Sequence, residues 1–510
     1  MFVRQKKNRS GTVSIQIIDK TSGKYRVVRT IGSSDDPDEI QKLLQKAHDI
    51  LHPNEYIQKP LFATTALEDM AVENFVEEME NAQIRTIGPE LIFGTLFDRI
   101  GFDQIKEELF RHLVIARLAY PTSKLKTVDY LYHYQGIKTN EDRIYRFLDT
   151  LNETHKEKVE KISYQHTQQT LGSIAVVFYD VTTLYFETED EDDLRKIGFS
   201  KDGKFQCPQI MIGLLVGPGG YPIGYDVFEG NTFEGHTLVS TLEQIQIKYD
   251  LGRPVVVADA AMLSKKNLRE LTEAGYTFIL GGRIKNENET TKAEILKKAK
   301  GVTDGTLFEI RRADRARLVV SFSEKRRAKD AHNRDRGIKR LRKRITSEDL
   351  AKNHLTNCGY NKFLTLKGKT PVEIDEDKIA QDTLWDGLKG YVTNSSLARK
   401  KVVEHYGHLW QIERAFRISK TDLRVRPVYH YKQERIKAHL CIAFVAYAIW
   451  KELEAILKTQ GMEMSPKRAG ELTHRMYALD YILPRSKKFK RKILGMDSEQ
   501  QDLYRAVNKK

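Results

Sequence analysis

The fold is decided by the stretch Tyr406-Gly-His-Leu-Trp-Gln-Ile-Glu413-Arg-Ala-Phe-Arg-Ile-Ser-Lys420. Its apolar residues recur at roughly helical spacing, which predicts an amphipathic helix. Tyr406, Glu413 and Lys420 stand seven residues apart, so we expect them to share one face of that helix. An acid between a phenol and an ammonium is unusual on a solvent-facing helix. The pattern therefore predicts a metal ligand with a phosphate-binding neighbour on each side.

Two further acids follow apolar runs of strand-forming residues upstream. Asp180 ends one such run and Asp259 ends another. Each run predicts a buried strand that presents a carboxylate at its end. Between them, Gly217-Pro-Gly-Gly220 joins two apolar runs and predicts a hairpin. A lone Asp in such a place is more often a turn or cap residue. Two of them in this strand order, followed by the Glu413 helix, favour a shared catalytic site.

The spacing of Tyr406, Glu413 and Lys420 resembles the Tyr-x2-Arg-x3-Glu-x6-Lys signature of bacterial insertion-sequence transposases with an Asp-Asp-Glu active site. This group is a branch of the ribonuclease-H-like superfamily. Leu409 departs from the pattern, because it stands where the signature has Arg. The resemblance extends over roughly residues 170–450 through these motifs.

The resemblance implies that Asp180, Asp259 and Glu413 bind two Mg²⁺ ions, for which Mn²⁺ can substitute. Carboxylate oxygens suit such ions, and phosphodiester chemistry uses two of them about 3.5–4 Å apart. We expect Asp180 to bridge the ions, with Asp259 and Glu413 holding one each. Tyr406 and Lys420 would contact phosphate oxygens near the scissile bond.

The resemblance also implies a function, that of a transposase of a bacterial insertion sequence. It would bind double-stranded DNA at the element's terminal inverted repeats and nick the element ends by hydrolysis. The free 3′-OH would then attack the other strand or target DNA, within a homodimer that pairs two ends in a synaptic complex. Members of the group often pass through hairpinned ends, with an aromatic side chain stacking on a flipped base. Trp385 and Trp410 are candidates for that role, although Trp410 is expected to pack in the core.

Composition favours a DNA-binding protein in a reducing compartment. The chain has 510 residues and a net charge of +15, which suits a polyanionic partner. Charge alone also fits a merely basic soluble protein. The three cysteines are far apart, which argues against a disulfide scaffold or a zinc site. The N-terminus is charged from its start, and the longest apolar run, residues 440–450, is too short to span a bilayer. We expect a cytoplasmic, nucleoid-associated protein without membrane contact.

The order of predicted elements is that of an α/β protein with a ribonuclease-H-like core of βββαβαβα order. A small β-hairpin unit and a helical DNA-binding region precede the core, and a β-rich basic insertion interrupts it. The predicted segments are residues 1–65 (hairpin plus helix), 66–169 (helical DNA-binding region), 170–282 (first part of the core), 283–390 (insertion), 391–457 (second part of the core with the Glu413 helix) and 458–510 (basic tail).

Basic residues in three places are candidates for DNA contact. Short helices over residues 124–134 and 141–151 look like a helix-turn-helix DNA reader, and a plain helical bundle explains them equally well. Residues 324–344 hold eleven Lys or Arg against three acids, and we favour a DNA-facing helix there over a solvated one. Two arginines near Glu413 can replace the missing signature Arg if their side chains wrap round the helix. The candidates are Lys124, Lys126, Arg143, Arg146, Arg326, Arg327, Arg340, Arg342, Lys343, Arg344, Arg414 and Arg417.

Two other functions fit the same residues. One is a catalytically silent, DNA-binding relative, against which the three intact carboxylates argue. The other is a ribonuclease-H-like nuclease that cuts without strand transfer. A strand-transfer assay separates the latter from a transposase.

Overall fold

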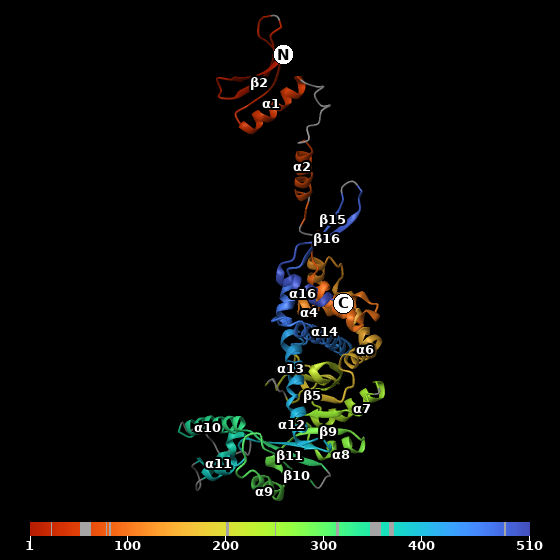
Figure 1. Ribbon diagram of the computed structural model, residues 1–510, viewed down its shortest axis with the longest axis vertical. Coiled ribbons are helices and arrows are strands. Elements are labelled where there is room, and N and C mark those ends of the chain that lie inside the picture. Colours follow the sequence, from red (N-terminus) through yellow and green to blue (C-terminus); the bar gives the residue numbers. More distant parts are fainter. Residues whose placement is uncertain are drawn as a thin grey trace. The chain divides into compact units, whose positions relative to one another are not determined.

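The structure is a computed structural model with two compact units, Met1–Asn81 and Ala82–Lys510 (Figure 1). Within the described residues, every helix is too short or too polar to cross a lipid bilayer. The description covers residues 1–509 apart from 22, 52–62, 78, 81–82, 200–202, 204, 250, 313–315, 347–358, 367–371 and 484–485.

The first unit is built on a three-stranded antiparallel sheet. Helix α1 (Pro37–Leu51) packs on it, with Ile15, Ile17 and Ala47 in a small core. The sequence predicted a two-stranded hairpin and missed the first strand, because that edge strand is mostly exposed and has no alternating apolar pattern. The elements are β1 (Phe2–Lys7), β2 (Val13–Asp19), β3 (Arg26–Ser34), α1 and then α2 (Ala63–Glu77).

An eight-stranded mixed sheet forms the centre of the second unit (Figure 1). Strand β6 lies between β5 and β7 and pairs antiparallel with both, whereas β5, β8 and β9 run parallel. This arrangement is consistent with the ribonuclease-H-like core expected from the sequence. In spatial order the strands are β10 (Leu307–Arg311), β11 (Arg317–Phe322), β14 (Leu388–Thr393), β9 (Thr277–Gly282), β8 (Val255–Ala258), β5 (Val176–Tyr185), β6 (Gln209–Val216) and β7 (Pro222–Glu229).

The predicted β-rich insertion is only partly a separate element. Strands β10 and β11 pair with each other, and β11 pairs with β14, so both extend the main sheet. The sequence does not reveal this pairing, because its two sides lie more than sixty positions apart in the chain. The basic stretch is helical, as expected. The elements outside the sheet are α10 (Glu324–Thr346), η11 (Gly359–Phe363), β12 (Leu364–Leu366), β13 (Val372–Ile374) and α11 (Glu376–Thr383).

Helices cover both faces of the sheet. Side chains alternate along β5, so that Phe178 belongs to one core cluster and Tyr179 to the other. The Tyr179 side is packed against α7 (Thr237–Tyr249), α8 (Lys265–Glu273) and α9 (Glu289–Lys298). The Phe178 side shares its core with α4 (Glu108–Ala119), α6 (Glu141–Leu171) and α14 (Gln433–Thr459).

The helices before the sheet pack with the C-terminal part of the chain. The helix expected to end at residue 151 continues to Leu171 as α6 and lies along α14. Ser123 caps the preceding helix, α5 (Lys124–Tyr130), as predicted. The described residues of the predicted tail, 458–483 and 486–509, are folded rather than a simple tail. They form α15 (Pro466–Thr473), β15 (Tyr477–Ile482), β16 (Phe489–Ile493) and α16 (Ser498–Asn508), and β15 pairs with β4 (Ile84–Thr86).

One buried hydrogen bond joins α14 to the hairpin of β6 and β7. The hydroxyl of Tyr447 donates to the carbonyl oxygen of Gly220 at 2.6 Å. Tyr447→Phe should lower the free energy of unfolding by about 1–3 kcal/mol, because it leaves a buried carbonyl without its donor. Calorimetry of the purified chain measures this loss. Tyr132→Phe, at a side chain that is 50% exposed, is the matched control and should change stability little.

Candidate active site

Asp180 and Asp259 lie side by side on neighbouring parallel strands. The last residues paired between β5 and β8 are Tyr179 and Ala258, so each aspartate directly follows a paired residue. Adjacent strands are about 4.8 Å apart. Because side chains alternate along a strand, both aspartates follow on the face opposite Tyr179 and Ala258, where α14 packs.

Asp180 lies in the middle of β5, whereas the sequence predicted a strand end. The partner strand β8 stops at Ala258, but β5 continues to Tyr185 because its second half still pairs with β6. Asp180 is partly buried, and one of its oxygens accepts a 2.8 Å hydrogen bond from the N–H of Val181. The carboxylate is thus held on the sheet beyond the end of β8.

Asp259 follows the end of its strand, as predicted. One of its oxygens accepts a 2.7 Å hydrogen bond from the N–H of Ala261 and caps η8 (Ala260–Met262). A capping role alone would explain this residue. Its place beside Asp180 is not something that a capping role requires.

Glu413 lies on α13 (Trp410–Arg417), which packs against β5 and β6. Ile412 and Ala415 bury one side of this helix, and Glu413 itself is exposed. Arg414 forms an ion pair with Glu454 of α14, which ties α13 to its neighbour. The helix is therefore anchored on the strand that carries Asp180.

The signature residues do not lie on one straight helix. Tyr406 is in α12 (Arg399–Gly407), Glu413 is in α13, and Lys420 is in the π-helical turn η12 (Ile418–Asp422). Hydrogen bonds of the tighter i to i+3 kind, such as His408 N–H to the carbonyl of His405, mark the break. The helix predicted over this stretch is therefore interrupted between Tyr406 and Glu413. Leu409, at the signature's Arg position, is buried, so this position belongs to the core.

Tyr406 lies close to all three carboxylates. Burial raises the pKa of its phenol, and the charges of Asp259, Glu413 and Asp180 raise it further. A Cβ built on Gly281 would lie 2.6 Å from the Tyr406 hydroxyl and 2.9 Å from the backbone nitrogen of Ala260. The absence of a side chain at residue 281 thus makes room for the phenol next to Asp259.

Lys420 lies on the same face of the sheet, further along β5. With Thr182 and Leu184 it lines a small cavity of about 50 Å³. It is partly buried, which suits a positioning role better than a solvated one.

The donor set fits Mg²⁺ in chemistry, because all three acids offer hard oxygen ligands. Within the described residues, no group of three or more His, Cys, Asp or Glu side chains is placed to hold a metal ion. The three carboxylates therefore share one face of the sheet without forming a closed set of ligands.

Lys389 of β14 also belongs to this region, and the sequence analysis missed it. Its ammonium lies 4.4 Å from the ring centre of Tyr406 and 5.6 Å from that of Tyr391. The alternation of Lys389 and Tyr391 along a strand could have indicated that both face the Glu413 helix.

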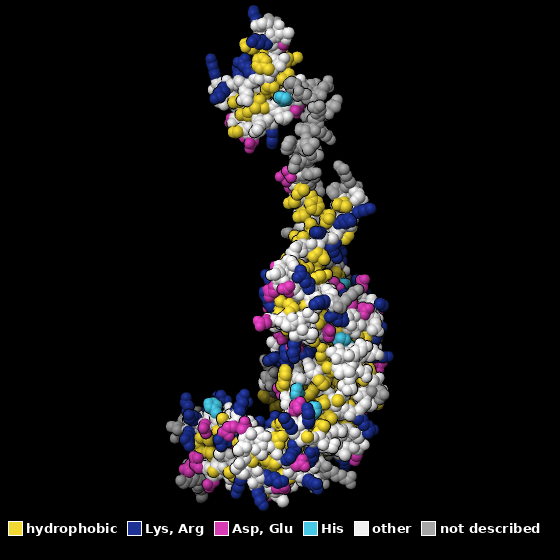
Figure 2. All heavy atoms as spheres, viewed as in Figure 1, with side chains coloured by type: hydrophobic (Ala, Val, Ile, Leu, Met, Phe, Trp, Pro, Cys, Tyr) yellow, Lys and Arg dark blue, Asp and Glu magenta, His cyan; other side chains and the backbone are white. Residues whose placement is uncertain are grey.

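The basic helix α10 is exposed along one side and anchored on the other. Arg334 is buried and makes two hydrogen bonds to Asp386, at 2.6 and 2.7 Å. Lys and Arg side chains lie over this region with acidic ones among them (Figure 2). Arg327 pairs with Glu324 and Arg342 with Glu376, whereas Arg340 and Lys343 are exposed, Arg344 is partly exposed and Arg326 lies 3.4 Å from Asp330.

Lys124 does not lie on the surface, contrary to the expectation of a DNA contact. It is 4% exposed, and burial together with nearby Arg117 lowers its pKa well below the ordinary value. The sequence does not distinguish it from its exposed neighbour Lys126, because both stand at the start of one amphipathic helix. Arg143, Arg146 and Arg417 are exposed.

The two tryptophans have different surroundings. Trp410 is 52% exposed, so the prediction that it packs in the core was wrong. Trp385 is partly buried against the core cluster on the Tyr179 side of the sheet.

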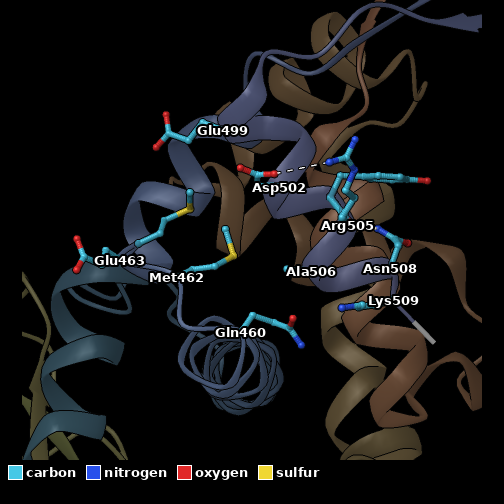
Figure 3. A pocket seen from close by; sticks show the side chains of 11 residues that line it. Gln460, Met462, Glu463, Glu499, Asp502, Arg505, Ala506, Asn508 and Lys509 are labelled. Carbon is cyan, nitrogen blue, oxygen red and sulfur yellow. Dashed lines mark hydrogen bonds and ion pairs between the residues drawn. The ribbon is translucent and has the colours of Figure 1, made fainter.

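A cavity of about 910 Å³ lies where α14 ends beside α16 (Figure 3). Gln460, Met462, Asp502 and Arg505 are among its lining residues, and Asp502 lies 3.9 Å from Arg505. None of the predicted site residues lines this cavity, so its size alone does not make it the active site.

Comparison with known proteins identifies the family of the chain. A family model described as "Transposase DDE domain" matches residues 172–449, which is more than half of the chain. A cryo-EM structure of the piggyBac transposase synaptic complex with hairpin DNA aligns at 10% identity and a TM-score of 0.39, covering 76% of each chain. The Mos1 transposase paired-end complex with the left transposon end aligns at 10% identity and a TM-score of 0.16, covering 46% of this chain and 71% of that one. No curated protein matches in sequence. The match over residues 172–449 shows that the chain belongs to the DDE transposase family.

Proposed function

We propose that the chain is the transposase of a bacterial insertion sequence, which cuts DNA at the element's terminal inverted repeats and joins the ends to target DNA. The observation that supports this most strongly is the register of β5 and β8, which sets Asp180 beside Asp259 under the helix of Glu413. Acids in this arrangement suit divalent metal ions and phosphate chemistry.

Asp180, Asp259 and Glu413 would hold Mg²⁺, or Mn²⁺ in its place. When bound, two such ions activate the attacking oxygen and stabilise the leaving oxygen. Asp180 is on β5, which pairs with β8 and also contacts α13, so it suits the bridging position.

Tyr406 and Lys420 would position the phosphate. The raised pKa of Tyr406 keeps its phenol protonated, so it can donate a hydrogen bond to a phosphate oxygen. Lys420 would supply positive charge further along β5. A homodimer that pairs two element ends in a synaptic complex, near the bacterial nucleoid, would complete the reaction.

The three carboxylates provide the first test. Asp180→Asn, Asp259→Asn or Glu413→Gln should abolish cleavage of a duplex that contains an inverted repeat, while gel-shift affinity stays nearly unchanged. An amide keeps the shape but loses the charge that holds the metal. Asp226→Asn is the matched control, because Asp226 lies on β7 of the same sheet and accepts the same kind of local hydrogen bond, from Val227 at 3.1 Å. A carboxylate variant that still cuts normally would be removed from the site.

The positioning residues should have smaller effects. We expect Tyr406→Phe and Lys420→Ala each to slow cleavage about 10²–10³-fold without abolishing it, as removal of one charge-stabilising donor typically does. Single-turnover rates measure this, with Tyr429→Phe, at a 65% exposed side chain, as the control. Unchanged rates in both variants would contradict the positioning role.

Helix α10 provides a test of DNA contact. Each neutralised phosphate contributes about 0.9 to the slope of log K against log salt. The slope of a variant without four contacting cations should therefore be shallower by up to about four times that amount. Sequence preference should barely change. The variant replaces four residues with Gln: Arg340, Arg342, Lys343 and Arg344.

A control of equal charge separates contact from net charge. It replaces exposed cations on or beside α8 and α9 with Gln: Lys265, Arg269, Lys297 and Lys300. If α10 is only a solvated helix, both folded variants will show the same salt slope.

A terminal strand-transfer assay separates the proposed function from simple cutting. Cleaved ends should become joined to a supercoiled target plasmid, and cleavage without joining would favour a nuclease instead.

A further inference from the structure

Lys389 holds an unusual place in the core sheet. It stands opposite Ser321 of β11, and its ammonium lies over the rings of Tyr391 and Tyr406, at 5.6 and 4.4 Å. The two rings themselves are 5.0 Å apart and inclined at 67°. Cation–π attraction to both rings favours this position of the charge.

No acid of the described residues lies within ion-pair distance of Lys389. Burial lowers its pKa; nearby Arg326 lowers it further, and Glu413 opposes the change. Cations that are largely buried are normally paired with an anion. The surroundings of Lys389 thus lack the negative partner that such a charge requires.

Lys389 lines a cavity of about 660 Å³ between β14, α10 and the segment around α11. Two cations of that cavity, Lys285 and Lys362, share one acid, Asp382, at 2.6 and 2.7 Å. Arg334 is likewise bound to Asp386.

The remaining cations of this cavity are weakly paired or have no acid partner among the described residues. Arg326 reaches Asp330 at 3.4 Å, and Arg283 and Lys389 make no ion pair there. The cavity wall next to Lys389 therefore carries excess positive charge.

Tyr406 connects this cavity with the three carboxylates. The ammonium of Lys389 lies over its ring, and its hydroxyl and the backbone nitrogen of Ala260, the residue after Asp259, both border Gly281. Lys389 and Asp259 therefore both lie near the same tyrosine side chain. A DNA strand with its scissile phosphate at the carboxylates would pass a neighbouring phosphate close to Lys389.

We propose that Lys389 is a substrate-binding residue, which holds a DNA phosphate adjacent to the scissile one at the mouth of the cavity shared with Arg326. The proposal rests on the proposed function, because it takes the carboxylates as the place of cutting. It adds a contact that lies outside the Tyr-Glu-Lys signature and comes from the sheet itself.

The test combines a side-chain change with a change in the DNA. The probe is a duplex that contains the inverted repeat flanking the coding region, with single uncharged methylphosphonates placed one at a time near the cleavage point. Lys389→Met keeps an apolar stem against the two rings but removes the charge, and Lys389→Arg keeps the charge. Lys339→Met, at an exposed lysine of α10, is the control.

We expect Lys389→Met to weaken binding of the unmodified duplex about 10- to 100-fold, the range for loss of a hydrogen bond to a charged group. Lys389→Arg should restore most of this loss, and the control should lose little. At one methylphosphonate position the affinity of the wild-type chain should fall by a similar factor. The affinity of Lys389→Met for that same modified duplex should equal its affinity for the unmodified one. A role in packing alone would leave every position equally costly in both proteins.

Unchanged affinity in a folded Lys389→Met variant would overturn the proposal. So would the absence of any methylphosphonate position that lowers the affinity of the wild-type chain but not that of Lys389→Met. Thermal unfolding of each variant checks that it is folded. Because binding is the measured quantity, the result is independent of cleavage. A wild-type chain that binds the duplex but never cuts it would contradict the proposed function instead.

Discussion

The parallel pairing of β5 with β8 is the constraint on which the whole site depends. The backbone hydrogen bonds of these strands, and not the carboxylates themselves, set the separation of Asp180 and Asp259. Two negative charges at neighbouring positions repel each other. Burial of β5 on both faces and the hydrogen bonds from Val181 and Ala261 oppose that repulsion and keep the pair in place.

The third acid is held by packing instead of by sheet register. Ile412 and Ala415 fix α13 against the strands, so Glu413 projects from a helix whose buried side is apolar. Around the acids stand groups that suit phosphate, above all Tyr406 and Lys389, which contact each other. Carboxylates at the centre of a site suit metal ions, and hydroxyl and ammonium groups around them suit the phosphates of a polyanion.

Local patterns in the sequence predicted the parts of the fold that depend on local physics. The glycine turn at 217–220, the strand before Asp259 and the cap at Ser123 follow from residue types and their spacing. Features that depend on residues far apart in the sequence could not be predicted from these local patterns. Asp180 lies within a strand because the pairing of β5 with β6 extends beyond the end of its pairing with β8. Lys124 is buried although its sequence context is like that of its exposed neighbours. The signature residues are seven positions apart, but a turn at His408 interrupts the helix between Tyr406 and Glu413.

The position of β14 also bears on the order in which the protein is completed. This strand lies between β9 and β11 although it follows both in the chain. During synthesis from the N-terminus, the edge of β9 stays open, and the hairpin of β10 and β11 has no place in the sheet until residues 388–393 emerge. An open edge of this kind is a risk for aggregation while it lasts. Glu413 emerges later still. A chain that the ribosome releases before residue 388 therefore has both aspartates, but its sheet is incomplete and the third acid is missing.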